Sequence, residues 1–233
     1  KKLKKYAKKK KIKFLCSVFD TESLDELLKI NIFDFKIPSG EINNIPLLQK
    51  ISKKAKRIFL SSGMANLKEI SYALKILKKN KYNKRNLYLL HCHTEYPTNL
   101  KNVNLLAMPK LKKIFKVRVG YSDHTLENKV AISAIALGAS VIEKHFTLSK
   151  NLKGPDHKAS LEPKELKKFV HDIKDTEILL GNANKKISLI ELSNKKLVRK
   201  SIVAKELIKK GQKFQEKNII CKRPEGGLSP LLW

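Results

Sequence analysis

The feature that most constrains the fold of this chain is a sixfold alternation of short apolar segments with longer amphipathic segments. The short segments are rich in β-branched and aromatic residues, which is typical of buried strands. The longer ones carry apolar residues at helical spacing, and one of them, 21–30, begins with Thr21 in a cap-like position. Strand and helix repeated in this way predict an α/β fold with a parallel sheet covered by helices. The predicted strands are 12–17, 33–38, 57–62, 87–92, 117–122 and 140–146.

Polar residues that are capable of chemistry stand at the carboxyl end of every predicted strand. A doubly wound sheet gathers its ligand groups near one crevice, whereas a TIM (β/α)8 barrel takes them from many strand ends around one mouth. Both folds fit the alternation, and the repeated polar strand ends favour the barrel. The positions concerned are 17, 39–41, 61–63, 91–94, 122–124 and 145.

The number of predicted strands and the composition of the tail set the expected domain organisation. A barrel of this kind closes with eight strands, so six strands after a basic helical start predict that the first two βα units are lacking. We expect a partial barrel over 1–182, a polar linker over 183–198 and an incomplete small domain over 199–233. The small domain has two strand-like runs before a Gly- and Pro-rich end. A chain cut in this way is expected to be nearly inactive alone.

The formal net charge of +30 raises the question of nucleic-acid binding. Nearly all of this charge is Lys, and it is spread along the whole chain, whereas Arg occurs only at 57, 85, 118, 199 and 223. Arg supplies the bidentate and stacking contacts that nucleic-acid recognition favours. We therefore interpret the lysines as a solvated surface and expect no specific nucleic-acid partner.

Cysteine usage and hydropathy indicate the expected compartment. Cys16, Cys92 and Cys221 are widely spaced and form no CxxC pair, which fits a reducing cytoplasm better than a disulfide framework. No apolar run approaches the roughly 20 residues that span a bilayer, and no signal-peptide core follows the basic start. We expect a cytoplasmic protein without a membrane partner.

Histidines follow two neighbouring predicted strands, in YSDHT (121–125) and EKHFT (143–147). His124 and His145 can reach one divalent cation, with oxygen ligands and waters completing the shell. The alternative is that each histidine is hydrogen-bonded in a polar barrel mouth without a metal, and spacing alone leaves both open. A zinc site around Cys92, between His91 and His93, is conceivable but lacks a second ligand pair.

Two small-residue turns, SGE (39–41) and SSGM (61–64), follow the second and third predicted strands. Such turns expose backbone N–H groups that, with a nearby lysine, can hold a phosphate. Lys36 lies three residues before Ser39 and can point into the barrel at about the same level. The alternative is that Gly40 and Gly63 merely permit tight turns.

Seven motifs, taken in order, resemble the strand-end motifs of the sialic acid synthase family: FLCSVFD, KIPSGEI, LSSGMA, LLHCHTEYP, VGYSDHT, GASVIEKHFT and GPDHKASLEP. The family includes the N-acetylneuraminate, legionaminate and pseudaminate synthases. The resemblance runs from about residue 10 to 182, and 199–233 resembles the start of the family's antifreeze-like (SAF) domain. It implies a transferase that forms a carbon–carbon bond between phosphoenolpyruvate and an N-acylated hexosamine of the N-acetylmannosamine type. The products are a nine-carbon sialic-acid-type sugar and phosphate.

The resemblance also implies roles for individual residues. His124 and His145 match the ligands of a divalent cation, Mn²⁺ or Mg²⁺, and the acidic residues Glu41 and Asp156 match the positions expected to handle protons. The residues that match substrate contacts are Ser17, Lys36, Ser39, Ser61, Thr94 and Ser122.

Four positions depart from the family pattern. Ser17 and Val18 stand where many members have Thr and Pro, Pro38 replaces a small residue, and Thr94 lies where some members have an amide side chain.

The resemblance further implies a homodimer in which each SAF domain covers the partner's barrel mouth. HCHTEYP and SGE resemble the N-acetylneuraminate and legionaminate branches more than the pseudaminate branch, without deciding between those two sugars. The alternatives are another phosphoenolpyruvate-condensing barrel, an inactive synthase fragment and, outside enzymes, a basic nucleic-acid-binding protein.

Overall fold

The computed structural model describes residues 1–80 and 82–233. The chain divides into two compact units, Lys1–Gly181 and Asn182–Trp233. We describe each unit by itself.

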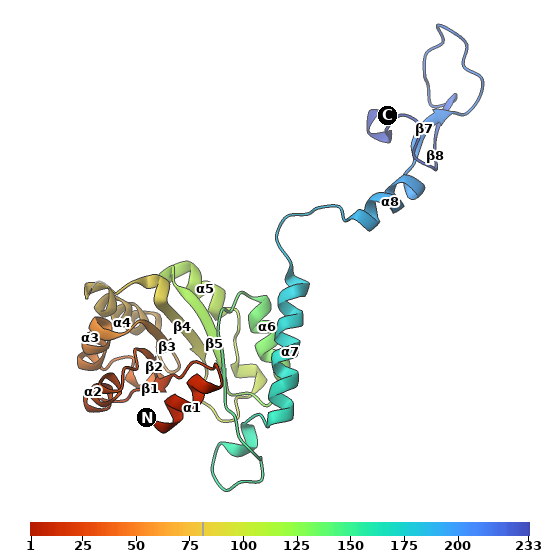
Figure 1. The fold of residues 1–233 in the computed structure, drawn as a ribbon. Helices are drawn as coiled ribbons and strands as arrows, with labels where there is room; N and C mark the ends of the chain where they lie inside the picture. Colours follow the sequence, from red (N-terminus) through yellow and green to blue (C-terminus); the bar gives the residue numbers. More distant parts are fainter. Residues whose placement is uncertain (81) are drawn as a thin grey trace. The chain divides into compact units, whose positions relative to one another are not determined.

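Unit 1 is built on a curled sheet of six parallel strands that follow one another in sequence order (Figure 1). Five of the strands lie inside the predicted ranges, and the remaining one is displaced by one residue, so the prediction of a parallel α/β sheet is confirmed. Within the part of the chain that the structure describes, β1 and β6 are the two edges of this sheet. The strands are β1 (Cys16–Ser17), β2 (Asp34–Ile37), β3 (Arg57–Ser61), β4 (Leu87–Cys92), β5 (Arg118–Asp123) and β6 (Ile142–Lys144).

In the described residues of unit 1, five helices connect the six successive strands and line the outer side of the curled sheet, and one further helix precedes β1 and another follows β6 (Figure 1). Side-chain caps fix where several of them begin, because the first backbone N–H groups of a helix have no partner within it. Asp20, and not the predicted Thr21, caps α2 by accepting from Ser23 N, since Thr21 is already the first helical residue. The helices are α1 (Lys2–Lys9), α2 (Thr21–Lys29), α3 (Ile45–Lys54), α4 (Leu67–Lys79), α5 (Ala107–Phe115), α6 (Asn128–Ala136) and α7 (Pro163–Leu180).

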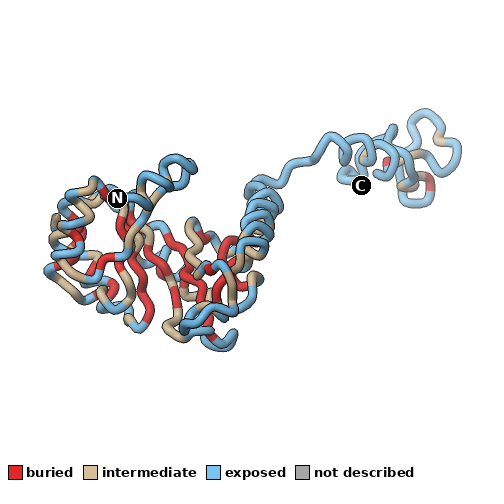
Figure 2. The backbone as a smooth tube through the Cα atoms, turned by 60° about the horizontal axis from the view of Figure 1, so that its bottom comes forward, coloured by how far each residue is buried: buried red, intermediate tan, exposed pale blue. Residues whose placement is uncertain are grey.

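The core of unit 1 lies between the sheet and these helices, and the buried segments follow the strands (Figure 2). Phe35 and Ile37 of β2 are fully buried and flank Lys36, which fixes the face on which Lys36 lies. By contrast, the lysine-rich helix α1 has no buried residue. None of the described helices is long and apolar enough to cross a bilayer.

Unit 2 contains helix α8 (Leu189–Val198) and an antiparallel pair of strands, β7 (Ser201–Ala204) and β8 (Ile219–Lys222). The helix lies inside the stretch 183–198 that we expected to be a linker. Its start is a capping box, in which Ser188 and Glu191 each accept a hydrogen bond from the other's backbone N–H. The polar composition of SLIELSNKK predicts a linker, and the capping signal at Ser188 and Glu191 explains why a helix begins there instead.

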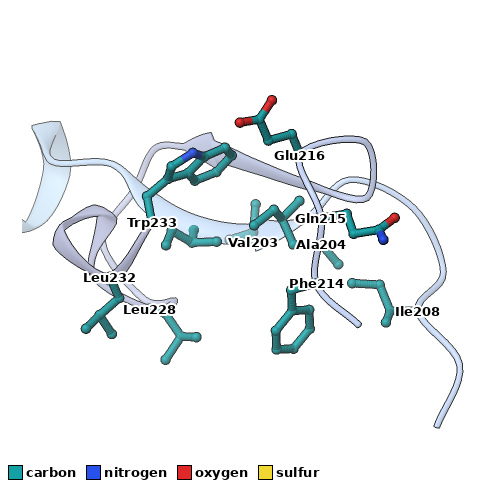
Figure 3. A pocket seen from close by; sticks show the side chains of 11 residues that line it. Val203, Ala204, Ile208, Phe214, Gln215, Glu216, Leu228, Leu232 and Trp233 are labelled. Atoms are coloured by element: carbon teal, nitrogen blue, oxygen red, sulfur yellow. The ribbon is translucent and has the colours of Figure 1, made fainter. Parts of the chain in front are cut away.

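An apolar cavity of about 410 Å³ lies in unit 2. Figure 3 shows Val203, Phe214, Leu228 and Trp233 among the side chains that line it. The predicted site residues all belong to unit 1, and none of them lines this cavity.

Gly120 on β5 allows a close approach of the backbone at Val141, just before β6. A Cβ atom added there would lie 2.6 Å from the backbone oxygen of Val141 and 2.7 Å from a methyl group of Leu90. Because backbone cannot yield as a flexible side chain can, we expect Gly120→Ala to lower the free energy of unfolding by about 1–3 kcal/mol.

Urea unfolding followed by far-UV circular dichroism checks this expectation. Gly40→Ala is the matched control, because nothing lies within 4 Å of a Cβ atom built on Gly40. Equal unfolding midpoints for the two variants would contradict the close approach at Gly120.

Candidate active site

Two imidazole rings meet edge to face at the carboxyl ends of β5 and β6. The ring centroids of His124 and His145 are 5.5 Å apart. The Nδ1 atom of His124 lies 2.7 Å from the backbone oxygen of His93. A carbonyl oxygen can only accept, so Nδ1 carries the proton and the lone pair of a neutral ring is on Nε2. That Nε2 atom lies 3.4 Å from Ser122 Oγ, at the mouth of the sheet.

The surroundings of His124 favour its neutral form. Burial lowers its pKa below the ordinary value of 6.5, and electrostatic interactions with the neighbouring His145 and Lys36 lower it further. The hydrogen bond to His93 and the charge of Glu143 act in the opposite direction, and the net shift is downward. The neutral imidazole is the form that binds a metal ion.

An ion pair crosses the site from β2 to β6. Lys36 Nζ donates to both carboxylate oxygens of Glu143, each at 2.7 Å, although 107 residues separate the two in sequence. Only 12% of the Lys36 side chain is exposed. Lys36 therefore points into the mouth, as the sequence predicted. Glu143 was missed, although it stands two residues before His145, where strand alternation puts both side chains on one face.

Aromatic and acidic side chains complete the surroundings of the two histidines. The Tyr96 ring centroid lies 4.2 Å from that of His124 and 5.7 Å from that of His145. Asp156, from the loop that follows β6, places Oδ2 3.7 Å from Nδ1 of His145. Tyr96 belongs to the quoted motif HCHTEYP, but no pattern in the sequence distinguished it from a packing aromatic.

The loop that follows β4 is bonded directly to the residue that carries the first imidazole. The backbone N–H of Thr98 donates to the backbone oxygen of His124 at 2.9 Å, and the ring of His124 donates back to His93. Within this loop, Glu95 accepts from the backbone of Asn99 at 3.1 Å. These bonds give the loop one defined path past the site.

A second cluster surrounds Gly63, after β3. Ser39 Oγ accepts from the backbone N–H of Gly63 at 3.1 Å and lies 3.3 Å from Cys92 Sγ. A Cβ atom on Gly63 would come within 2.9 Å of both Ser39 Oγ and a methyl group of Thr94. Glycine is therefore needed here for close packing, and the structure brings Ser39 and Thr94 together around it.

Three other predicted residues have different surroundings. The hydroxyl of Ser61 is buried and has no hydrogen-bond partner among the described residues. Ser17 is exposed at the end of β1 and pairs in register with Lys36. Glu41 accepts from Asn44 Nδ2 at 2.7 Å, beside the start of α3. Among the contacts of the described residues, none joins Glu41 or Ser17 to the two histidines.

The donor set around His124 and His145 fits a divalent cation held by two nitrogens, with oxygen ligands filling the other positions. The bond from His124 Nδ1 to a backbone carbonyl is the outer contact that metal-binding histidines commonly make. Within the described residues, no group of three or more His, Cys, Asp and Glu side chains is placed to hold a metal by itself. The zinc alternative is disfavoured because His91 bonds to Val103 O and Cys92 lies against Ser39.

Comparison with known proteins decides the family, because residues 1–185 match the sequence model of the NeuB family. The chain belongs to the NeuB family. It is 54% identical over 226 residues to N,N'-diacetyllegionaminic acid synthase of Campylobacter jejuni, covering 97% of this chain and 68% of that protein. It is 42% identical over 221 residues to the Legionella pneumophila protein of the same name, covering 94% and 62%. The chain thus spans about two thirds of the length of these relatives.

A solved structure agrees with this placement in the NeuB family. The N-acetylneuraminic acid synthetase of Leptospira borgpetersenii superposes with a TM-score of 0.77 at 36% identity, covering 82% of this chain and 66% of that one. The resemblance to sialic acid synthases inferred from the motifs is therefore confirmed at the level of the family.

We expect His124 to titrate below pH 6.5, because its folded-state pKa is lowered by burial. A lowered histidine pKa contributes stability that is present above the unfolded-state value and is lost as the pH falls through the folded-state value. NMR titration of the His124 ring measures the pKa directly. In His124→Gln, the loss of unfolding free energy on acidification below pH 6.5 should be smaller than in the parent. A His124 pKa at or above 6.5 would contradict the described burial.

Proposed function

We propose that this chain carries the site at which phosphoenolpyruvate condenses with an N-acylated hexosamine to give a nine-carbon sialic-acid-type sugar and phosphate. The observation that carries the proposal is the convergence of Lys36, His124 and His145 at the mouth of a NeuB-family sheet. The ammonium group of Lys36, beside two imidazoles that can hold a cation, suits a substrate that bears both phosphate and carboxylate.

The proposed reaction forms one bond between the substrates and breaks one bond in phosphoenolpyruvate. C3 of phosphoenolpyruvate attacks the open-chain carbonyl carbon of the hexosamine, and the carbonyl oxygen takes up a proton. Water then adds to the electron-poor C2 and loses a proton, and phosphate leaves by cleavage of its C–O bond. The protein has to hold two anionic groups, orient the carbonyl and move protons.

Lys36 is proposed to hold an anionic group of phosphoenolpyruvate. Its ammonium group is already turned into the mouth by Glu143, so little side-chain freedom is lost when the substrate binds. The hydroxyl of Ser61, which is buried and has no partner among the described residues, and that of Ser122 are further donors proposed for the same substrate. Ser17, Ser39 and Thr94 remain proposed contacts at the adjoining strand ends.

His124 and His145 are proposed to hold one Mn²⁺ or Mg²⁺ ion. When bound, such an ion supplies Lewis-acid polarisation of the sugar carbonyl. Asp156 lies beside His145 and is proposed to move protons at the carbonyl oxygen. Glu41 remains the alternative proton carrier, although its carboxylate accepts from Asn44.

The comparisons support a choice between the two sugar branches that the motifs left open. The two relatives described above are both named N,N'-diacetyllegionaminic acid synthases. We therefore propose the diacetamido hexosamine that gives N,N'-diacetyllegionaminic acid as the acceptor, in preference to N-acetylmannosamine. A cytoplasmic location and a homodimer whose SAF domains cover the partner's site belong to the same proposal.

An inactive synthase fragment is the second candidate, and one observation favours it. In the described residues the sheet has two edges, β1 and β6, instead of a closed barrel. Substrate binding is therefore a more sensitive test of this chain than turnover.

We expect the chain to bind phosphoenolpyruvate and Lys36→Met to bind it at least about tenfold more weakly, since one charge-assisted contact is lost. Isothermal titration calorimetry measures the affinity, and Lys110→Met on the exposed surface of α5 is the control.

Turnover is measured as phosphate release with Mn²⁺ and each acceptor, in comparison with an intact relative. Equal affinity in both variants would remove Lys36 from the site. Turnover matching the intact relative would refute the fragment interpretation.

We expect His124→Ala and His145→Ala each to weaken Mn²⁺ binding by about 10- to 100-fold while the fold survives, because a cation left with one imidazole is under-coordinated. Electron paramagnetic resonance of free Mn²⁺ measures the affinity, and circular dichroism reports the fold. His93→Ala is the control, since His93 accepts the hydrogen bond from the His124 ring with its backbone oxygen, which the substitution retains. Mn²⁺ affinity that is unchanged in both variants would refute the cation site.

A further inference from the structure

Directly behind the two site histidines lies a buried ion pair that the proposed reaction does not use. Lys144 Nζ is 2.7 Å from Asp123 Oδ2, and the two side chains are 4% and 0% exposed. Asp123 immediately precedes His124 and Lys144 immediately precedes His145. The two residues are also cross-strand partners in the register of β5 and β6. One interaction therefore joins the two strand ends that carry the imidazoles.

Strand alternation separates this pair from the site. Successive side chains of an extended strand point to opposite faces. Ser122 and His124 share one face, since Ser122 Oγ lies 3.4 Å from His124 Nε2. Asp123 and Thr125 share the other face, where they are bonded to each other. Lys144 reaches Asp123 on that second face, so neither member of the pair faces the substrate side.

Further bonds close this pair into a network around the backbone of His124. Asp123 Oδ1 accepts from the backbone N–H of Thr125 at 2.9 Å and from its hydroxyl at 2.8 Å. Lys144 Nζ also donates to the backbone oxygen of Thr125 at 2.7 Å. The residues before and after His124 are thus held by one ammonium group that comes from the residue before His145.

Stability alone does not account for such a pair. Removing two charges from water costs about as much as their attraction returns, and apolar side chains of similar volume often serve equally well. A fully satisfied polar network provides defined geometry, because hydrogen bonds are directional and each donor is held toward its acceptor. Loops that hold ligands need that definition more than the core does.

We propose that Asp123 and Lys144 are positioning residues that hold His124 and His145 at the separation needed to share one divalent cation. The part of this proposal that concerns the cation rests on the proposed function, whereas the part that concerns the positions of the two rings does not. Disruption of the pair should let the ends of β5 and β6 move independently. His124 should then lose its fixed bond to His93, and the two rings should no longer meet at one point.

The first experiment compares two double variants of the same chain. Asp123→Asn with Lys144→Met removes both charges, so no unpaired charge is left buried, and retains an acceptor for Thr125. Asp34→Asn with Arg57→Met removes the matched cross-strand ion pair of β2 and β3, which lies at the opposite ends of the strands. Thermal unfolding curves identify a temperature at which both variants are folded, and the measurements are made there.

Two measurements then separate positioning from general stability. Electron paramagnetic resonance titration with Mn²⁺ alone should show about tenfold weaker binding in the first variant and parental binding in the second. Nitrogen NMR of the imidazole rings, without metal, should show the Nδ1–H tautomer of His124 in the parent and the second variant, and a tautomer mixture in the first. An unchanged tautomer in the first variant would overturn the proposal.

A milder variant covers the case in which the first one does not fold. Thr125→Val keeps the ion pair and the side-chain volume but removes one donor to Asp123. It should weaken Mn²⁺ binding by a few-fold and broaden the His124 ring signals, and unchanged signals would again overturn the proposal. If the parent binds no Mn²⁺, the cation site of the proposed function fails, and the ring signals alone decide whether the pair positions His124.

Discussion

The common direction and register of the strands is the constraint on which the candidate site depends. Because all six strands run parallel, their carboxyl ends lie on the same side, at the mouth of the curled sheet. Lys36 on β2 can therefore reach Glu143 on β6. A shift of one residue in β2 would turn Lys36 outward. The burial of Phe35 and Ile37 on either side of it opposes that shift, so the core and the site are specified by the same alternation.

The sequence predicted the scaffold of the site well because the signals for it are local. Apolar runs bounded by polar residues located all six strands. The predicted range of β5 was one residue too early, but this offset does not change the face on which Ser122 lies. The inward direction of Lys36 followed from strand period alone. Helix starts were less certain, because neighbouring residues such as Asp20 and Thr21 can both serve as caps. The start of α8 at Ser188 was hidden in a polar stretch.

Contacts between residues distant in sequence could not be predicted in the same way. Glu143, Tyr96 and Lys144 each stand inside or beside recognised motifs, yet their partners lie on other strands or loops. Which carboxylate meets which lysine depends on the register of strands that only the folded sheet brings together. Net composition was no guide either, since Lys36 and Lys144 are paired with carboxylates in a chain that has a large excess of lysine.

The bonds between the loops after β4 and β5 have a consequence for how this site can change over evolutionary time. The backbone oxygen of His124 accepts from the backbone N–H of Thr98, and the His124 ring donates to the backbone oxygen of His93. The first bond joins the two loops through main-chain atoms, which no side-chain substitution removes, and the second adds to it as long as His124 is present. An insertion in either loop would displace the other unless it were compensated. We therefore expect the lengths of these two loops to vary together among homologues, while the residues between the anchoring bonds diverge freely and alter the shape offered to a sugar.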